Sequence, residues 1–359
     1  MKLFYDYQCF SQRSGGISRY FYEVISRVRN YPDTCVEVPL FFSNNMYLDH
    51  KRKFLPRRHF KGKTWITDRI NGAYSRHYLS RAAGTFDLFH PTYYTPYFLD
   101  LIGNKPFVIT VHDMTHELFP QLFRNPGKTT DEKRRVTSAA AKIIAVSANT
   151  KRDLVRHFDI PEEKIEVVYH GNALRYTEEL AVPYAKYLLF VGDRGVYKNF
   201  APMLRTIAPI MKSRGLEMVC VGGRGFSSVE IGFLSELGLV DRVHQVEGVS
   251  DPLLAAYYHH AVALVYPSRY EGFGMPVLEA FACGCPVVTS SAASLPEVGG
   301  EAAVYFDATN ETSLFAAVEQ VTGDDRLREA LREKGYVQET KFSWDIAAEK
   351  TYAVYGSVV

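Results

Sequence analysis

One short stretch, Glu271-Gly-Phe-Gly-Met-Pro-Val-Leu-Glu279, places two carboxylates eight residues apart around a glycine-rich turn. Its two glycines and its proline make a continuous helix unfavourable. The pattern instead predicts a strand over 263–266, a loop that holds Glu271 and a helix from about Met275. Backbone amides at that helix start can face an anion, and Glu279 follows one turn deeper. This arrangement suits a ligand with hydroxyl groups at both ends and phosphates in the middle, as in a nucleotide-sugar.

The composition is that of a globular protein with room for two domains. The chain has 359 residues, of which 47% are hydrophobic and 23% are charged. Its net charge of +2 is too small to indicate a nucleic-acid binder. Five cysteines, an odd number in a long chain, argue against a disulfide framework. The pair Cys283-Gly-Cys285 has no second Cys/His pair at zinc-site spacing, so we expect no metal there.

The chain carries no targeting or membrane-spanning signal. No stretch approaches the roughly 18 apolar residues of a membrane span, and the first residues are typical of a buried strand rather than of a signal peptide. We therefore expect a cytoplasmic protein. The basic run 51–63 contains seven Lys/Arg residues interleaved with aromatics. It is either a solvated loop or a contact for an anionic acceptor or for headgroups at the inner face of the membrane, and a nucleic-acid contact is the weaker interpretation.

Strand and helix signals alternate along the chain, which predicts α/β domains with parallel sheets and helices on both faces. In the first half the expected strands cover 2–5, 36–41, 88–90, 107–111, 142–145 and 165–168. In the second half they cover 187–191, 217–221, 243–246, 263–266 and 286–288. Strand signals stop over 174–183, which predicts a linker there. Apolar residues at helical spacing predict a last helix over 344–355.

The pattern from Tyr266 to Ser290, followed by Ser294-Leu-Pro-Glu-Val-Gly-Gly300, closely resembles the retaining family 4 glycosyltransferases, which have the GT-B fold. The resemblance spans nearly the whole chain and is loosest across 44–85. It implies two doubly wound Rossmann-like domains that face each other across a cleft. The implied parts are an acceptor-side domain over 1–175, a donor-side domain over 176–340, and a C-terminal helix over 341–359 that packs back on the first domain.

Transfer of a sugar from a nucleotide needs fixed positive groups, because negative charge grows on the leaving diphosphate. In Val191-Gly-Asp-Arg-Gly-Val-Tyr-Lys-Asn199, the resemblance assigns Lys198 to the donor phosphates and makes Asn199 a donor-binding residue. Arg194 is a less secure match. It precedes Lys198 by four residues, whereas many relatives carry their arginine five residues before the lysine. A surface ion pair is the alternative for Arg194.

The resemblance gives the two glutamates different roles. Glu271 would bond hydroxyl groups of the transferred sugar, and Glu279 would accept from the ribose hydroxyls, as an ionised carboxylate can. The backbone amides of Phe273, Gly274 and Met275 would meet the sugar or the phosphates. Among these residues, Glu271 would be catalytic together with Lys198 and a histidine from the first domain.

That histidine is His112, which ends a predicted strand where ligands collect in open α/β sheets. The resemblance implies that His112 hydrogen-bonds the donor sugar near its anomeric carbon and that Asp113 orients the loop. Gly15-Gly16 resembles the family's loop facing the donor diphosphate, although alone it would be only a turn. Ser147 either caps a helix or shapes the cleft, and His170 is a further cleft candidate.

Together these patterns predict a retaining, metal-independent hexosyltransferase without a cofactor beyond its nucleotide-sugar. No Asp-x-Asp element stands between strand signals to hold a divalent cation. Mannose is slightly preferred as the sugar, and a saccharide, possibly lipid-linked and in polysaccharide or O-antigen synthesis, is the expected acceptor. We favour departure and attack on one face of the sugar. The alternatives are a catalytically inactive sugar-nucleotide-binding protein, a phosphorylase and a sugar-nucleotide epimerase.

Overall fold

The structure is a computed structural model that describes residues 1–13, 15–48, 62–82 and 84–359. It divides the chain into two compact units. Unit 1 comprises Met1–Gly171 and Trp344–Val359, and unit 2 comprises Asn172–Ser343. Apart from Gly62 and Lys63, the basic run 51–63 lies outside the described residues. Within the described ranges, no helix has both the length and the apolar character needed to cross a membrane.

The described part of unit 1 contains six parallel strands, which confirms the parallel α/β architecture predicted for the first half. The strands form two three-stranded sheets, in the orders β2-β1-β3 and β4-β5-β6, and a β-bridge between Phe89 and Phe107 links the two sheets. Leu3 on the central strand pairs with Val36 and Leu88 on either side. The strands are β1 (Lys2–Tyr5), β2 (Cys35–Glu37), β3 (Leu88–His90), β4 (Val108–Val111), β5 (Lys142–Ala145) and β6 (Ile165–Val167).

One expected strand of unit 1 is several residues shorter than predicted, and β4 and β6 are each one residue shorter than the predicted 107–111 and 165–168. The prediction of a strand over 36–41 is wrong beyond Glu37, where β2 ends. Pro39 follows closely and has no backbone N–H to donate to a strand ladder. The amides of Phe41 and Phe42 donate instead to Oδ1 of Asn71, at 3.1 and 2.9 Å.

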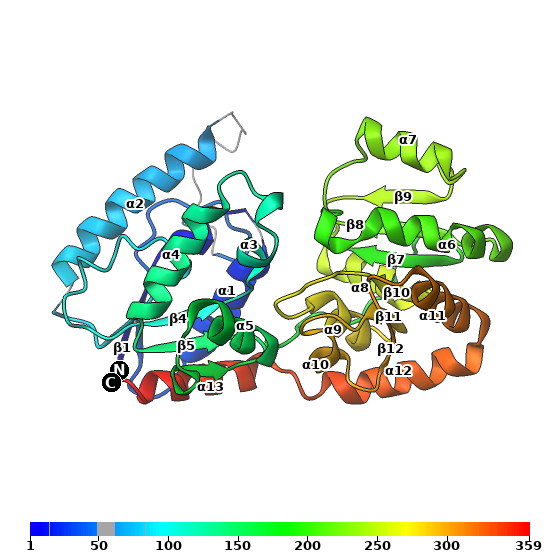
Figure 1. Ribbon diagram of the computed structural model, residues 1–359. Helices are drawn as coiled ribbons and strands as arrows, with labels where there is room; N and C mark the ends of the chain where they lie inside the picture. The colour runs from blue at the N-terminus through cyan, green and yellow to red at the C-terminus, as the bar shows by residue number, and fades with distance from the viewer. Residues whose placement is uncertain (14, 49–61, 83) are drawn as a thin grey trace. The chain divides into compact units, whose positions relative to one another are not determined.

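The helices of unit 1 surround these strands (Figure 1). They are α1 (Gly16–Val28), α2 (Lys63–Ala82), α3 (Thr115–Leu118), α4 (Pro126–Ala139), α5 (Ala148–Phe158) and α13 (Trp344–Gly356), with the 3-10 turns η1 (Gln8–Ser11), η3 (Pro120–Leu122) and η4 (Glu162–Lys164). Helix α13, drawn red, packs along α1: Arg27 pairs with Asp345 at 2.6 Å, and the hydroxyl groups of Tyr5 and Tyr355 lie 2.7 Å apart. The last helix therefore completes the core of unit 1.

Unit 2 is a six-stranded parallel sheet in the order β12-β11-β10-β7-β8-β9. Its strands are β7 (Tyr187–Val191), β8 (Glu217–Val221), β9 (Val243–Val246), β10 (Ala263–Tyr266), β11 (Val287–Ser290) and β12 (Ala303–Phe306). The predicted strand over 286–288 is displaced, because Pro286 has no N–H and pairing starts after it. The edge strand β12, which pairs only with β11, was not predicted.

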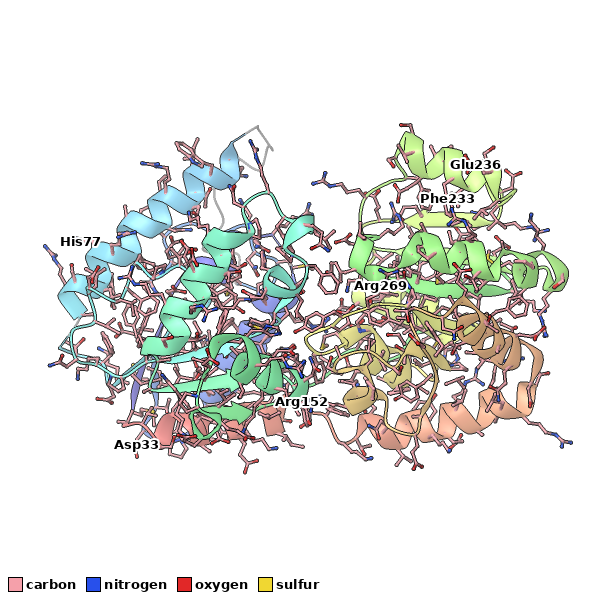
Figure 2. The ribbon with its side chains drawn as sticks, in the orientation of Figure 1. Asp33, His77, Arg152, Phe233, Glu236 and Arg269 are labelled. Atoms are coloured by element: carbon pink, nitrogen blue, oxygen red, sulfur yellow. The ribbon has the colours of Figure 1, made fainter. Side chains whose placement is uncertain are left out.

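The connections of unit 2 are mostly helical. The helices are α6 (Phe200–Arg214), α7 (Ser228–Glu236), α8 (Asp251–His260), α9 (Met275–Ala282), α10 (Leu295–Gly299), α11 (Glu311–Gly323) and α12 (Asp325–Glu339), and the short turn η5 (Val196–Lys198) follows β7. On α7 the side chain of Glu236 is exposed, whereas Phe233 is partly buried and packs against the core of unit 2 (Figure 2). Helix α9 begins at Met275, as predicted.

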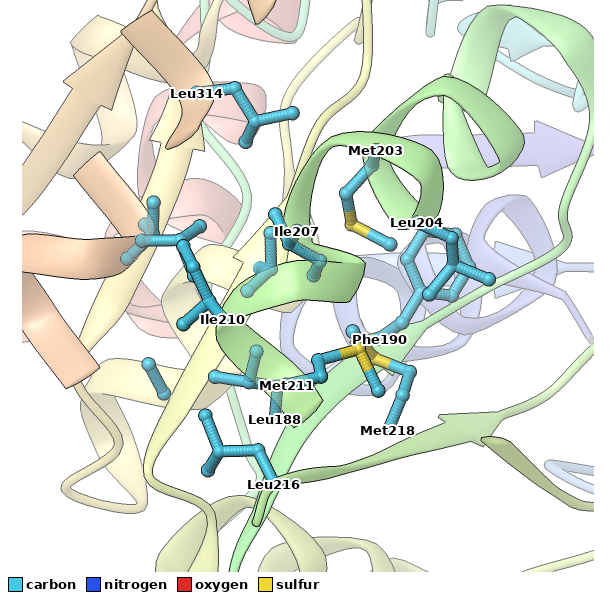
Figure 3. Close-up of a cluster of buried hydrophobic side chains, with 14 of the residues drawn as sticks. Leu188, Phe190, Met203, Leu204, Ile207, Ile210, Met211, Leu216, Met218 and Leu314 are labelled. Carbon is cyan, nitrogen blue, oxygen red and sulfur yellow. The ribbon is translucent and has the colours of Figure 1, made fainter. Parts of the chain in front are cut away.

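A buried cluster between the sheet and α6 holds unit 2 together (Figure 3). Leu188 and Phe190 on β7 meet Met203 and Ile207 on α6, and all four are fully buried. Each such side chain contributes about 1.5–3 kcal/mol relative to an exposed one. This packing fixes β7 and the start of α6, and with them the loop between the two elements.

The strand order of unit 2 reverses between β7 and β10, which are neighbours in the sheet although two strands separate them in the chain. In open parallel sheets, ligands bind beyond the carboxyl ends of the strands at such a reversal point. The loops after β7 and after β10 both start at this place. They are the two segments in which the sequence predicts Lys198 and Glu271.

Candidate functional site

Lys198 and Glu271 meet at the reversal point of the unit 2 sheet. Nζ of Lys198 lies 2.6 Å from Oε1 of Glu271 and 3.1 Å from the hydroxyl of Tyr266, at the end of β10. The two charged side chains are only 12% and 13% exposed. The topology therefore joins a cation and a carboxylate that are 73 residues apart in the chain.

Backbone contacts fix the two loops around this pair. The amide of Arg269 donates to the carbonyl of Tyr197 at 2.8 Å, which ties the β10–α9 loop to η5. The side chain of Arg269 itself is exposed (Figure 2). Lys198 is thus held on a turn whose backbone is bonded to the loop that carries Glu271.

Lys198 is an ammonium group in this setting. Burial has the largest single effect and lowers the pKa of Lys198, but the charge and hydrogen bond of Glu271 together with Tyr266 and Tyr197 outweigh it, and the pKa lies well above its ordinary value. Burial also raises the pKa of Tyr266, so its hydroxyl keeps its proton. An anionic ligand entering here would meet a permanent positive charge that is already partly desolvated, where electrostatic attraction is strong.

The loop that carries Glu271 is fastened by Ser294, a fully buried residue just before α10. Its hydroxyl donates to the carbonyls of Glu271 and Phe273, at 2.9 and 2.8 Å. Gly274 follows with a φ of 109° and begins α9 without a side-chain cap. No role was predicted for Ser294. It lies 23 residues beyond Glu271 in the chain, so only the fold brings its hydroxyl to this loop.

Glu279 lies on the inner face of α9 and is 8% exposed. One carboxylate oxygen accepts from the hydroxyl of Tyr258 on α8 at 2.9 Å. Burial, followed by the charge of Glu279, raises the pKa of Tyr258 well above its ordinary value, so this hydroxyl remains a donor. Glu271 pairs with a cation and Glu279 with a neutral hydroxyl, so the two glutamates have different environments.

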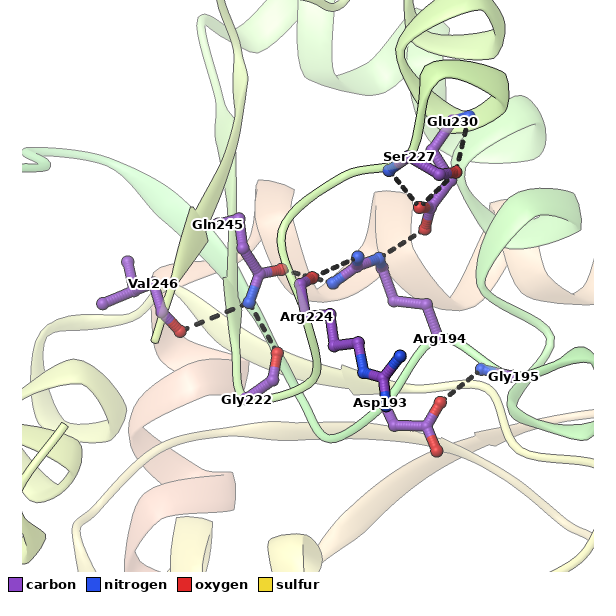
Figure 4. A network of polar contacts seen from close by, with 9 residues as sticks. All are labelled: Asp193, Arg194, Gly195, Gly222, Arg224, Ser227, Glu230, Gln245 and Val246. Carbon is purple, nitrogen blue, oxygen red and sulfur yellow. Dashed lines mark hydrogen bonds and ion pairs between the residues drawn. The ribbon is translucent and has the colours of Figure 1, made fainter. Parts of the chain in front are cut away.

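Arg194 is engaged within unit 2 (Figure 4). Its guanidinium pairs with Glu230 at 2.7 Å, donates to the carbonyl of Arg224 at 2.6 Å and bonds the side-chain oxygen of Gln245. The side chain is 6% exposed. This network corresponds to the ion-pair alternative, and the donor-binding role of Arg194 stays a prediction.

Asn199 begins α6 in a left-handed conformation, with a φ of 58°. Its side-chain amide donates to the carbonyl of Ala308 at 3.0 Å. The residue is 3% exposed, so its side chain shapes the loop that presents Lys198.

In unit 1, His112 directly follows β4 and lies in an aromatic cluster. Its ring stacks on His170 with centroids 5.9 Å apart and meets the edge of Tyr20 at 5.1 Å. Its amide donates to the hydroxyl of Tyr94 at 3.1 Å, while its buried Nε2 has no hydrogen-bond partner among the described residues. Burial lowers the pKa of His112 to about 4, a change that Asp113 opposes and a nearby lysine reinforces.

That lysine, Lys133 on α4, is a residue that the sequence analysis missed. It is fully buried, and its Nζ donates to the carbonyl of Asp113 at 3.0 Å and to Oε2 of Glu117 at 2.8 Å. The Asp113 carboxylate accepts from the amide of Thr115 at 2.9 Å. The helical spacing could have predicted its burial, because Lys133 falls on the same face of α4 as the buried Val136.

The other predicted residues of unit 1 open helices or line the aromatic cluster. Gly15 precedes α1 as its N-cap and Gly16 is its first residue. Ser147 is fully buried and accepts from the amide of Thr150 at 3.0 Å, so it caps α5. His170 packs against Trp344 of α13 at 5.6 Å, and burial lowers its pKa well below the ordinary value.

Neither unit presents a metal-binding cluster within the ranges that the structure describes, where no three His, Cys, Asp or Glu side chains are grouped to hold an ion. The predicted site residues belong to two different units of the chain. Lys198, Glu271, Glu279 and the start of α9 belong to unit 2, and His112, Asp113 and His170 belong to unit 1.

Two known families match this chain. The family described as Glycosyltransferase Family 4 matches residues 14–174, and Glycosyl transferases group 1 matches residues 178–338. The O-antigen chain mannosyltransferase B of Escherichia coli is 28% identical over 281 residues, which cover 74% of this chain and 72% of that protein.

Solved structures show the same fold along the whole chain. Sucrose-phosphate synthase from Thermosynechococcus elongatus has a TM-score of 0.77 at 18% identity, over 99% of this chain and 98% of that one. HepE from Anabaena, solved in complex with UDP and glucose, has a TM-score of 0.75 at 16% identity, over 99% and 100%. These similarities confirm the predicted GT-B fold.

Proposed function

Since the chain belongs to the glycosyltransferases that join a family 4 domain to a group 1 domain, we propose that it transfers a hexose from a nucleotide-diphosphate sugar to a saccharide acceptor. The observation that carries this proposal is the buried Lys198–Glu271 pair at the reversal point of the unit 2 sheet. The Lys198 ammonium suits a diphosphate, and the Glu271 carboxylate suits sugar hydroxyls. Unit 2 would take the donor and unit 1 the acceptor.

Donor binding exchanges partners at this pair. The Lys198 ammonium turns from Glu271 to the diphosphate, a dianionic group that attracts it more strongly than one carboxylate does. Glu271 is then released to accept from the hydroxyls of the hexose. Glu279 accepts from the ribose hydroxyls, and the amides of Phe273, Gly274 and Met275 face the sugar or phosphates at the start of α9.

The reaction breaks the bond between the anomeric carbon and the diphosphate oxygen and forms one to the acceptor hydroxyl oxygen. The proton of that hydroxyl passes to the leaving diphosphate on the same face, so that the anomeric configuration is retained. Lys198 stabilises the negative charge that grows on the diphosphate. His112, neutral because burial lowers its pKa to about 4, offers a hydrogen bond to the hexose without adding positive charge beside a cationic ring.

Mannose is the proposed hexose, and a lipid-linked saccharide of polysaccharide or O-antigen synthesis is the proposed acceptor. The support is the similarity to the O-antigen chain mannosyltransferase B of Escherichia coli. The similarity to HepE, which was solved with UDP and glucose, supports a nucleotide-sugar donor of the same general kind. We place the reaction in the cytoplasm, because its co-substrate is a nucleotide-sugar.

A donor panel tests the proposal. UDP-, GDP- and ADP-hexoses are incubated with the protein, with and without saccharide acceptors, and nucleoside diphosphate release and product anomeric configuration are followed by NMR. We expect release of the diphosphate with one donor, faster with acceptor, and a retained configuration. Binding without any turnover would instead indicate an inactive binding protein. Formation of a hexose 1-phosphate from inorganic phosphate would indicate a phosphorylase, and a changed hexose on an intact nucleotide an epimerase.

A further inference from the structure

Lys133 is a buried cation in unit 1. Its side chain is 0% exposed, and that of its partner Glu117 is 4% exposed. Removing both charges of such a pair from water is costly, and well-packed apolar residues are often at least as stable in its place. A face of α4 that already buries Val136 and Thr137 could hold an apolar side chain here. Stability alone therefore does not account for a lysine at this position.

Both hydrogen bonds of the Lys133 ammonium go to the His loop, which we define as residues His112–Glu117. Nζ donates to the carbonyl of Asp113 at 3.0 Å, near the start of the loop, and to the carboxylate of Glu117 at 2.8 Å, at its end. It also lies 5.0 Å from the ring centre of Tyr94, whose hydroxyl accepts from the amide of His112. The Lys133 ammonium thus bonds both ends of the His loop and also contacts Tyr94 beside it.

The His loop cannot hold itself in this way. Met114 and Thr115 lead straight into α3, a helix of four residues, Thr115–Leu118, whose N-cap makes no side-chain hydrogen bond. Asp113 stabilises Thr115, two residues on, through both its amide and its side chain. The backbone carbonyl of Asp113 is held from α4, by the ammonium of Lys133.

We propose that Lys133 is a positioning residue that fixes the His loop and thereby aims the His112 imidazole at the donor sugar. The role of His112 rests on the proposed function. The link between Lys133 and His112 rests on the contacts of unit 1 alone.

The charges around His112 give this link a measurable signature. Burial lowers the pKa of His112 to about 4, Asp113 opposes this, and Lys133 reinforces it. The remaining groups that face the ring are His170, His90, and the phenols of Tyr20 and Tyr94, all uncharged at neutral pH because burial shifts each pKa away from neutrality. Burial therefore has the largest effect on the pKa of His112, Asp113 and Lys133 modify it as charged neighbours, and removal of Lys133 raises it.

The test uses the full chain with Lys133→Met combined with Glu117→Gln. The single Lys133→Met variant would strand the Glu117 carboxylate in the interior and unfold the unit, whereas the double variant removes both charges together. Lys128→Met is the matched control. It makes the same substitution on the same helix, but its side chain is 75% exposed and pairs with Glu132 at 3.8 Å.

Two readouts are followed. The kcat of the double variant should fall by about 10²-fold, as expected when a reacting group shifts by about 1 Å, while the donor KM stays near that of the wild type because the phosphate and ribose contacts are assigned to unit 2. In NMR titrations, the pKa of the His112 ring should rise from about 4 toward the ordinary 6.5. Lys128→Met should change neither.

The outcomes separate the two proposals. A folded double variant with wild-type kcat overturns the positioning role, and so does a loss of kcat with an unshifted His112 titration, because the surroundings of the ring would then be unchanged. If the wild type transfers no hexose from any donor, the proposed function fails. The NMR titration of His112 in the two variants then still decides whether Lys133 controls this ring.

Discussion

At the scale of single residues, Glu271 and Glu279 are chemically identical but have different neighbours. Glu271 is paired with the Lys198 ammonium at 2.6 Å, whereas Glu279 accepts from the Tyr258 hydroxyl at 2.9 Å. The first partner is a positive charge that a diphosphate can compete for, and the second is a neutral donor. The roles proposed for the two carboxylates follow from this difference.

Substitution of each glutamate should have a separate kinetic effect. Glu279→Ala should chiefly raise the donor KM, because a ribose contact holds ground state and transition state alike. Glu271→Ala should chiefly lower kcat, by about 10²-fold, because its contact strengthens as the sugar ring becomes positive. Steady-state kinetics with varied donor concentration measures both effects.

Titration with the free nucleoside diphosphate is the control for that assignment. Glu271→Ala should bind it nearly as well as the wild type does, and somewhat better if Lys198 is freed for the phosphates. Glu279→Ala should bind it poorly. The reverse pattern would exchange the two roles.

The buried histidines should make unit 1 less stable in acid. Burial lowers the pKa of His90 to about 3 and that of His112 to about 4, from an ordinary 6.5. Between pH 6.5 and these values the unfolded chain binds protons that the folded chain does not. The contribution of these histidines to the free energy of unfolding is therefore complete above pH 6.5. It falls with decreasing pH, by about 1.4 kcal/mol per pH unit for each histidine.

Urea unfolding at several pH values between about 7 and about 5 measures this slope. The variant His112→Asn, which cannot titrate, should show a shallower slope than the wild type. His77→Gln is the control, because the side chain of His77 is exposed on α2 (Figure 2). Equal slopes in wild type and His112→Asn would contradict the prediction.

At the scale of elements, the start of α9 depends on a glycine that no other residue can replace without strain. Gly274 has a φ of 109°, and a Cβ built there would lie 2.8 Å from Cδ2 of Leu295 on α10. The same turn holds the Glu271 loop through Ser294. The helix start, the loop and α10 are therefore a single packed unit.

Gly274→Ala should destabilise the protein by about 1–3 kcal/mol and lower kcat, because the strained backbone moves the Glu271 loop. Gly232→Ala is the matched control. Gly232 lies inside α7, and a Cβ added to it would meet no atom within 4 Å, so alanine there should stabilise by about 0.5–1 kcal/mol. Thermal unfolding and kcat are measured for Gly274→Ala and Gly232→Ala. Equal effects of the two substitutions would contradict the special role of Gly274.

At the scale of the whole molecule, the chain builds unit 1 from both of its ends. Unit 2 is one continuous segment, Asn172–Ser343, whereas unit 1 needs Trp344–Val359 to cover α1. Trp344 packs against Tyr20 and His170, and Tyr355 bonds His90 at 2.7 Å. The two units should therefore respond differently to truncation.

The segment 172–343 expressed alone should fold and bind the nucleoside diphosphate within about tenfold of the full chain, a difference of about 1.4 kcal/mol. The segment 1–343, which lacks α13, should keep that binding but lose the protection of unit 1 amides against hydrogen exchange. Loss of nucleotide binding by 172–343, despite a folded spectrum, would show that unit 2 does not hold the donor by itself.

Activity should survive chelation. The charge of the leaving diphosphate is assigned to Lys198 and to backbone amides at the start of α9 rather than to a divalent cation. Transfer rates are measured with and without excess EDTA, and Lys198→Met serves as the positive control for lost charge stabilisation. Loss of activity with EDTA and rescue by Mg²⁺ or Mn²⁺ would overturn this assignment.

Local signals in the sequence were sufficient for much of this protein. The glycines, the proline and the apolar run around Glu271 specify a strand, a loop and a helix from Met275, because each acts on the backbone within a few residues. The same holds for most strand positions and for the last helix. The alternation of these elements predicted parallel sheets and, through the resemblance, the GT-B fold, which the structure confirms.

The partners of the site residues were decided by the tertiary structure alone. Lys198 meets Glu271 because β7 and β10 are neighbours in the sheet, and Arg194 meets Glu230 and Gln245, which lie 36 and 51 residues further along the chain. Lys133 is buried because α4 packs over the His loop. Such pairings depend on strand order and helix packing, which bring together segments far apart in sequence. No pattern within a short window encodes them, so only the folded chain could show which charges are already paired.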